Sequence, residues 1–356
     1  MSCDFEFCPA VGEMTFELVV NSIQYHQMIQ QTCAICGRNN YTVLYPENFD
    51  VNKINSRIFS ARRLPDRIHY QIVKCKNCDL VYSTPILEYD KIEKLYKKSF
   101  TTYDEYLENL KETYGYYLRQ LKKYNNFLGG SRGKASANAQ NFSSPPLVRA
   151  FAERNRLTES KKLRLLEIGC GNGFFLEEAA TLGYEVYGVE PGKKSVEKAK
   201  PEIKKNIIID IFKPGQFKKN FFDVVCCFQT FDHIPNPNET LAESYKILKK
   251  DGLMLFFNHD VGAWQNKLMG EKSPIIDIEH TYLFDKQTMR KIFEKHNFKV
   301  IEVQSSFNVH HLSYWLQLFP LPDFLKLPLI NFLNFIKLGK IKIKMYPGNL
   351  VIFAQK

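Results

Sequence analysis

Residues 163–173, LRLLEIGCGNG, constrain the fold of this chain more than any other segment. Leu165, Leu166 and Ile168 belong to an apolar run that is typical of a buried strand, and the glycines after it let the backbone turn sharply near a ligand. We expect Phe174–Leu182 to continue as a helix. A buried strand, a glycine turn and a helix are typical of a parallel-sheet domain that binds a nucleoside cofactor.

The spacing of the glycines favours S-adenosylmethionine (SAM) over a dinucleotide. Dinucleotide-binding turns read GxGxxG and seat a pyrophosphate on the helix N-terminus, whereas Gly169, Gly171 and Gly173 read GxGxG. Glu167 lies just ahead of the turn, where a carboxylate would repel a pyrophosphate and attract the cationic methionine amine. The sequence therefore predicts that Glu167 and the three glycines bind SAM.

Strands and helices alternate after this turn, which is typical of a doubly wound α/β fold. We expect a Rossmann-like, mostly parallel sheet of seven strands. The strands are expected at 163–168, 184–190, 206–210, 222–228, 253–258, 299–303 and 349–354, with helices near 174, 193, 239 and 285–296. Lys340–Met345 is expected as an edge strand or as half of a hairpin that turns at Pro347–Asn349.

Further cofactor contacts are expected where the second, third and fourth strands end. Glu190 follows the glycine turn by about twenty residues, a position from which an acid accepts hydrogen bonds from both ribose hydroxyls. Asp210 is expected to accept a hydrogen bond from the adenine amino group, with helix capping as the alternative. Gln229 leaves the fourth strand at the same edge and is a further candidate.

Histidines beside carboxylates supply the candidate catalytic groups. Asp232 and His233 follow the fourth strand, and a carboxylate there would raise the pKa of the imidazole and orient it as a general base. Bracing the cofactor pocket is the competing interpretation of this pair. His280 is a second candidate base, with a structural histidine bonded to a backbone carbonyl as its alternative. His259 lies along the same edge.

Two CxxC pairs precede the sheet. Cys33 and Cys36 form the first pair, and Cys75 and Cys78 form the second. Each pair makes a tight turn that presents two thiolates, so the two turns together predict a tetrahedral zinc site. Redox use of one pair is the rival interpretation, but the surrounding residues lack a thioredoxin-like βαβ pattern.

The other segments define the expected domain organisation. Residues 1–31 are an N-terminal extension with Met28 as the expected native start, 32–86 a zinc-binding module with strands at 68–73 and 80–82, 87–128 a helical connector, 129–160 a flexible linker with a lead-in helix, and 161–356 the cofactor domain. The connector has a stripe of tyrosine and leucine at helical spacing: Tyr103, Tyr106, Leu107, Leu110, Tyr114, Tyr117, Leu118 and Leu121. Such a stripe is typical of core packing, with one or two hydroxyls facing a substrate as the alternative.

The net charge of the chain and one apolar segment indicate which partners the protein could bind and where it is located. The chain has 49 Lys and Arg against 38 Asp and Glu, a formal charge of +11 that favours phosphate-bearing small molecules, nucleic acid or anionic membranes. Scattered solubilising lysine explains the charge equally well. Residues 312–338 are expected to pack as a lid over the substrate crevice, with a basic amphipathic membrane-contacting surface as the alternative. We expect a cytoplasmic protein, because no membrane-spanning apolar run or cationic leader occurs.

The chain resembles class I methyltransferases with an N-terminal cysteine module, a group that includes sugar C-methyltransferases of polysaccharide and natural-product pathways. The resemblance rests on CAICG, VKCKNCDLVYSTP, LLEIGCGNGFFL, GVEP, FDHIPNP, LKKDGLMLF and EHTYLFD. It implies that the glycine turn and Glu190 hold SAM, that the four cysteines hold zinc, and that His280 is a candidate base. Relatives carry Glu-His where this chain has Asp232 and His233, so the acceptor cannot be carried over.

We therefore expect a SAM-dependent methyltransferase acting on carbon or oxygen of a small hydroxylated metabolite, with a sugar or nucleotide-linked sugar as the favoured acceptor. The sulfonium methyl is already electrophilic, so the protein has to align a nucleophile and remove a proton. An RNA methyltransferase is the alternative indicated by the positive charge, although the cysteine module lacks a dense basic and aromatic stretch. A cofactor-binding protein without transferase activity is the third hypothesis.

Overall fold

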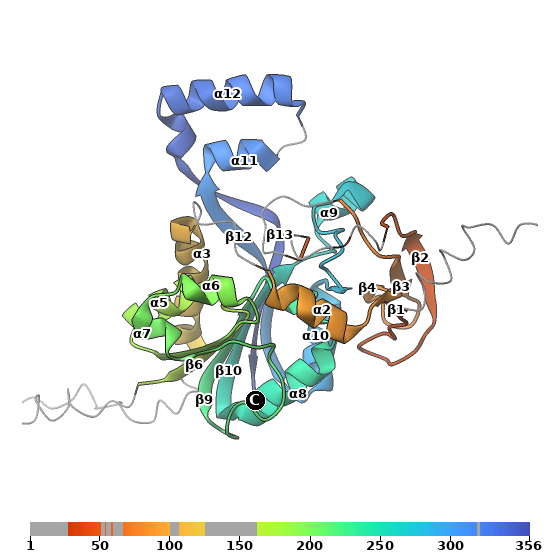
Figure 1. Cartoon of the computed structure of the whole chain (residues 1–356), viewed down its shortest axis with the longest axis vertical. Coiled ribbons are helices and arrows are strands. Elements are labelled where there is room, and N and C mark those ends of the chain that lie inside the picture. The colour runs from red at the N-terminus through yellow and green to blue at the C-terminus, as the bar shows by residue number, and fades with distance from the viewer. Residues whose placement is uncertain are drawn as a thin grey trace, which may run out of the picture.

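The computed structural model describes residues 28–50, 54, 58–59, 67–99, 107–124, 162–318 and 321–356 (Figure 1). Three of the expectations above lie outside the described residues. They concern the extension before Met28, the tyrosines at 103 and 106, and the linker at 129–160.

A seven-stranded sheet forms the centre of the molecule (Figure 1). Its spatial order is β12 (Lys299–His311), β13 (Lys342–Gln355), β10 (Leu248–His259), β9 (Phe222–Phe228), β6 (Arg164–Ile168), β7 (Glu185–Val189) and β8 (Ile207–Ile208). Neighbours from β8 to β10 pair in parallel, whereas β13 runs antiparallel to both β10 and β12. The predicted mostly parallel α/β sheet is confirmed.

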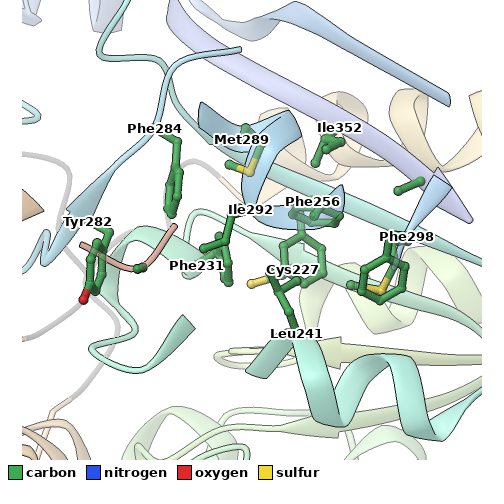
Figure 2. Close-up of a cluster of buried hydrophobic side chains, with 14 of the residues drawn as sticks. Cys227, Phe231, Leu241, Phe256, Tyr282, Phe284, Met289, Ile292, Phe298 and Ile352 are labelled. Atoms are coloured by element: carbon green, nitrogen blue, oxygen red, sulfur yellow. The ribbon is translucent and has the colours of Figure 1, made fainter. Parts of the chain in front are cut away.

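Helices cover both faces of this sheet because its central strands are apolar on both sides. In β9, Val224 and Cys226 face one hydrophobic core, and Val225 and Cys227 face the other. The first core includes α3 (Leu107–Gln120) and α5 (Phe174–Thr181), and the second includes α8 (Pro237–Ile247) and α10 (Lys286–Lys295). Figure 2 shows Met289 and Ile292 of α10 in the second core. The short helices α6 (Lys193–Glu197) and α7 (Pro201–Lys204) follow β7.

The tyrosine and leucine stripe of the connector packs in the core, as its spacing predicts. Tyr114 is stacked on Phe228 with ring centroids 4.3 Å apart. The Tyr117 hydroxyl accepts a hydrogen bond from the Phe307 backbone N–H at 2.9 Å. These described tyrosines therefore fix α3 on the sheet. The connector also contains α2 (Tyr89–Lys97), which lies at the carboxyl edge of the parallel strands.

The cysteine module is built on a second, smaller sheet. Its strands are β2 (Tyr41–Tyr45), β3 (Ile72–Cys75), β4 (Val81–Ser83) and β11 (Tyr282–Leu283), beside a two-stranded sheet of β1 (Met28–Ile29) and β5 (Ile86–Leu87). The strand expected at 68–73 begins later than predicted. Strand β11 comes from the segment between β10 and α10, so one sheet joins the cysteine module to residues that follow the cofactor domain's fifth strand.

The hairpin predicted to turn at Pro347–Asn349 is wrong. Residues 342–355 form one strand that passes through Pro347 and Gly348 and pairs with β12 along most of its length. A register shift in β12 between Ser306 and Asn308 lies opposite this point. Proline lacks an N–H and Gly348 has a φ of 94°, so the two residues are accommodated in a bulge instead of reversing the chain.

The described residues between β12 and β13, 312–318 and 321–341, form an arm that projects away from the sheet (Figure 1). The arm contains α11 (Leu312–Leu318), α12 (Asp323–Phe335) and the 3-10 turn Leu338–Lys340. Phe324 and Phe335 of α12 are 75% and 85% exposed. The expected burial of this segment as a packed lid is therefore wrong for α12, which packs mainly on α11 and the 3-10 turn. Tyr314 and Trp315 of α11 are buried. None of the described helices is long and apolar enough to span a membrane.

Candidate active site

The glycine turn after β6 leaves no room for side chains. Gly169, Gly171 and Gly173 have φ values of 75°, 54° and 74°, which non-glycine residues rarely adopt. A Cβ on Gly169 would lie 2.4 Å from Cγ2 of Thr230, the second residue after β9. The turn is thus pressed against the end of a neighbouring strand.

Glu190 closes the turn from the end of β7. Its carboxylate accepts hydrogen bonds from the N–H groups of Gly171 at 2.9 Å and Gly192 at 2.8 Å. Burial raises the pKa of Glu190, and the two backbone hydrogen bonds lower it in part. The structure thus brings the predicted ribose-binding acid into direct contact with the predicted glycine turn.

Two buried polar atoms near this turn lack a hydrogen-bond partner among the described residues. They are Oε2 of Glu167, in β6, and Oε1 of Gln229, just after β9. Burial and the nearby charge of Glu190 raise the pKa of Glu167 well above its usual range. Unpaired buried oxygens are costly, and a ligand with hydrogen-bond donors would relieve that cost. These oxygens and the closed turn fit a nucleoside cofactor that carries an amino group.

Asp210, the predicted adenine contact, takes part in two ion pairs. Its carboxylate forms ion pairs with Lys213 and, at 3.2 Å, with Lys97 of α2. Burial raises the pKa of Asp210, but hydrogen bonds from Lys213 and Lys97 outweigh it, so the net pKa lies below the ordinary value. An adenine amino group would have to share this carboxylate with two lysines.

Three histidines surround the buried carboxylate of Asp232. His259 Nδ1 lies 2.7 Å from Oδ2 of Asp232, His280 Nε2 lies 4.0 Å from the same oxygen, and His233 Nε2 lies 3.7 Å from Oδ1. The His280 ring centroid is 4.7 Å from that of His233 and 4.8 Å from that of His259. We call these four residues the histidine cluster. Ligand atoms of Asp232, His233 and His280 are also close enough together to hold a metal ion.

Backbone contacts fix the orientation of His280. Its Nδ1 lies 2.8 Å from the carbonyl oxygen of Ile275. Because a carbonyl only accepts, the neutral ring carries its proton on Nδ1 and leaves the Nε2 lone pair toward Asp232. The next residue, Thr281, donates its N–H to the Asp232 carbonyl at 2.9 Å. His280 therefore combines the two arrangements considered from the sequence: a bond to a backbone carbonyl and a position beside an acid.

Burial sets the protonation of the cluster. It lowers the pKa of His233 to about 3, even though the Asp232 charge acts in the opposite direction. Burial also lowers the pKa of His280. For Asp232, burial raises the pKa, but the attraction and hydrogen bond of His259 outweigh it and the net shift is downward. The carboxylate acts on the pKa of the neighbouring imidazole in the expected direction, but the net pKa of His233 is lowered because desolvation is the larger effect.

Helix α2 links the histidine cluster to the cofactor-binding residues. The Tyr96 hydroxyl lies 3.1 Å from Nδ1 of His233, and the next residue, Lys97, pairs with Asp210. No sequence pattern predicted a role for Tyr96 or for His259. The available signal for Tyr96 was weak, since it is one of many tyrosines in a helical segment that is otherwise explained by core packing.

A cavity of about 790 Å³ opens beside the histidine cluster. Its lining includes Asp260, Trp264, Lys267, Asp285 and Lys286. Asp260 directly follows His259, but neither the cluster nor the glycine turn contributes to the lining. The volume suits a small molecule.

The four cysteines of the two CxxC pairs converge as predicted. Sγ of Cys33 lies 3.1 Å from Sγ of Cys78, and Sγ of Cys36 lies 3.6 Å from Sγ of Cys75. All four sulfur atoms lie within 4.8 Å of one another, and none of these cysteines forms a disulfide. Four thiols at these separations fit a closed tetrahedral zinc site.

Comparisons with known proteins agree with this geometry. Residues 139–303 match a family model described as a methyltransferase domain. The chain is 35% identical over 112 residues to a ubiquinone biosynthesis O-methyltransferase of Pelagibacter ubique, covering 30% of this chain and 47% of that protein. A protein of the same name from Caulobacter sp. is 30% identical over 115 residues, covering 31% and 46%. The chain thus spans about half the length of the curated relatives it matches.

Similar chains also occur among solved structures, and we give one example. The example is a SAM-dependent methyltransferase from Archaeoglobus fulgidus, which is 19% identical in sequence to this chain, with a TM-score of 0.38. The match covers 68% of this chain and 99% of that chain.

Proposed function

We propose that this chain transfers a methyl group from SAM to a hydroxyl oxygen of a small molecule, in keeping with the match of residues 139–303 to a methyltransferase domain. The observation that carries the proposal is the histidine cluster beside the glycine turn. Thr230 packs on Gly169, and Asp232 follows Thr230 by two residues, so one short segment connects the two parts of the site. Relatives named O-methyltransferases favour oxygen over carbon as the acceptor atom.

One set of residues would bind the cofactor, and the histidine cluster would accept a proton from the acceptor. The glycine turn, Glu167, Glu190 and Gln229 would hold SAM, which when bound supplies an electrophilic methyl group. His280 would accept the proton of the acceptor hydroxyl at Nε2, because burial keeps its ring neutral and the Ile275 carbonyl occupies Nδ1. The ionised Asp232 would stabilise the imidazolium that results, and His259 holds that carboxylate in place.

The proposed acceptors are hydroxylated small molecules. A sugar or nucleotide-linked sugar is the acceptor expected from the sequence resemblance, and the names of the related O-methyltransferases add precursors of ubiquinone. Bulk RNA belongs in the same panel because of the formal charge of +11. The test measures uptake of labelled methyl from SAM by each acceptor class, after calorimetry with S-adenosylhomocysteine. Absence of nucleoside binding by the wild type would refute the proposal.

A matched pair of histidine variants tests the assigned base. His280→Asn should retain affinity for S-adenosylhomocysteine within about twofold and lose about 100-fold or more in the rate of methyl transfer. His296→Asn is the control, because His296 lies at the end of α10 and contacts Asn238 on the face covered by α8. Equal rates for His280→Asn and the wild type would show that another group removes the proton.

We also propose that Cys33, Cys36, Cys75 and Cys78 hold one structural zinc ion. Two thiols come from the turn ahead of β2 and two from the β3–β4 connection, and their convergence supports this assignment over redox use of one pair. Metal analysis of the purified protein should return one zinc per chain.

A further inference from the structure

The outward side of α12 carries an apolar surface that no described part of the chain covers. Seven side chains form this apolar face, and six of them have large exposed fractions: Phe324 75%, Leu325 52%, Leu329 41%, Phe332 58%, Phe335 85% and Ile336 39%; the seventh is the exposed Pro328. At about 100° per residue, these positions fall in one continuous arc of about 140°. Ile330 on the opposite side of the helix is buried.

A band of lysines accompanies the apolar face. Residues 312–348 contain five lysines, at 326, 337, 340, 342 and 344, and a single acid, Asp323. Among the described contacts, Lys342 pairs with Glu112 of α3, and Lys344 lies over the Phe307 ring at 4.9 Å. Apolar side chains flanked by lysine are typical of helices that lie in the headgroup region of an anionic membrane.

The body of the protein holds the arm in a defined position. Thr113 of α3 accepts a hydrogen bond from the Val309 N–H at 3.0 Å, and Trp315 of α11 donates to the Ile343 carbonyl at 3.1 Å. Tyr117 of α3 contacts the same strand two residues earlier. The apolar face therefore belongs to an arm whose base is anchored to the body of the protein.

The arm also rises from the edge that carries the candidate active site. Both β10 and β12 run antiparallel to β13, so β12 ends on the same side of the sheet as β10 and His259. Asn349 pairs with both His259 and Ser306, and β12 continues for five residues past Ser306 to His311. At about 3.3 Å per residue, this extension places the base of the arm about 16 Å beyond the end of β10.

We propose that the arm docks on an anionic lipid surface, with the apolar face of α12 inserted among the headgroups and the lysine band against lipid phosphates. The helix has 13 residues, fewer than the ~20 needed to span a bilayer, so it would lie in the interface. A second copy of this chain fits less well, because symmetric pairing of two arms would bring one lysine band near the other. Docked in this way, the arm directs the carboxyl edge of the sheet toward the membrane.

Vesicle flotation of the whole chain tests the proposal. The wild type should float with phosphatidylcholine vesicles that contain about 30% phosphatidylserine, and far less with phosphatidylcholine alone or at high salt. Two double variants, F324S/F335S and K337E/K340E, should each lower the fraction bound by about tenfold or more.

Matched controls separate the arm from general effects of hydrophobicity and charge. V43S/L44S removes two exposed apolar side chains from β2, and K218E/K219E reverses two exposed lysines ahead of β9. Both controls should float like the wild type. Near-native circular dichroism should accompany every variant that loses binding.

Two results would overturn the proposal. One is equal flotation of F324S/F335S and the wild type. The other is a wild type that does not bind either vesicle. In that case light scattering would show whether the wild type is a dimer that F324S/F335S converts to a monomer. A dimer of that kind would assign the apolar face to self-association. Because flotation does not depend on methyl transfer, this outcome is distinct from failure of the proposed activity.

Discussion

Ser83 Oγ donates a hydrogen bond of 3.0 Å to the backbone carbonyl of His280. Ser83 ends β4 of the cysteine module, and its own N–H donates to the Thr281 carbonyl at 2.9 Å. The residue proposed as the catalytic base is thus held by a strand that begins three residues after Cys78. The four cysteines of the CxxC pairs thus lie near the start of β4, and the histidine cluster lies near its end.

Loss of the zinc site should therefore reduce methyl transfer more than nucleoside binding. We expect Cys78→Ser to abolish zinc binding and to lower the rate of methyl transfer by about tenfold or more, because β4 would no longer hold His280. The affinity for S-adenosylhomocysteine should stay within about threefold, since the glycine turn lies on the other sheet. Cys226→Ala, which changes a core cysteine of β9, is the control for zinc content.

Ser83→Ala isolates the hydrogen bond from the metal. Removal of one buried hydrogen bond costs about 1 kcal/mol, so we expect a decrease of about fivefold in the rate of methyl transfer with unchanged zinc content. Ser244→Ala is a matched control, because Ser244 is fully buried in α8 and its hydroxyl has no hydrogen-bond partner among the described residues. A wild-type rate in Ser83→Ala would show that the backbone of β4 is sufficient to position His280.

Two glycine variants test the close approach at the turn. Gly169→Ala adds a Cβ that would lie 2.4 Å from Thr230, whereas Gly183→Ala adds one with no described atom within 4 Å. Both residues have positive φ, 75° and 94°, so both variants carry a similar backbone cost of about 1 kcal/mol. Only Gly169→Ala should also lose affinity for S-adenosylhomocysteine, by about tenfold or more in calorimetry. Equal affinities in the two variants would argue against a cofactor at this turn.

Much of the sheet could be predicted from the sequence because its central strands carry their own signal. In β9, FDVVCCF is buried on both faces, and a continuous apolar run of that length is typical of a parallel strand. The limits of β12 and β13 could not be predicted in the same way. Beyond Ser306 their side chains are supported by α3 and by each other, and these contacts join residues far apart in the sequence.

The candidate site shows a similar division. Positions fixed by a local pattern, such as the CxxC pairs and the acid after β7, could be found from spacing alone. The partnership of His259 with Asp232, and of Tyr96 with His233, depends on how three separate segments meet. The net pKa of His233 could not be read from its neighbour in the sequence either, because burial outweighs the adjacent carboxylate.

Burial of the histidine cluster predicts a loss of stability in mild acid. The pKa of His233 is about 3 in the folded protein against 6.5 for an unperturbed histidine. Below pH 6.5 the unfolded chain therefore binds a proton at His233 that the folded chain does not, so the free energy of unfolding decreases as the pH falls toward 3. The depressed pKa of Asp232 acts in the same direction at lower pH, because its contribution is lost as that carboxylate is protonated.

The His233→Gln variant measures this contribution directly. One fewer titrating group should reduce the pH dependence of the free energy of unfolding by up to about 1.4 kcal/mol per pH unit. Urea denaturation at a series of pH values between neutral and about 5 gives the two slopes, and the variant should be the less sensitive protein. The variant also loses the contact with the Tyr96 hydroxyl. That loss lowers the free energy of unfolding by the same amount at every pH, so it does not contribute to the difference between the two slopes. A variant as acid-sensitive as the wild type would mean that His233 titrates near its ordinary pKa.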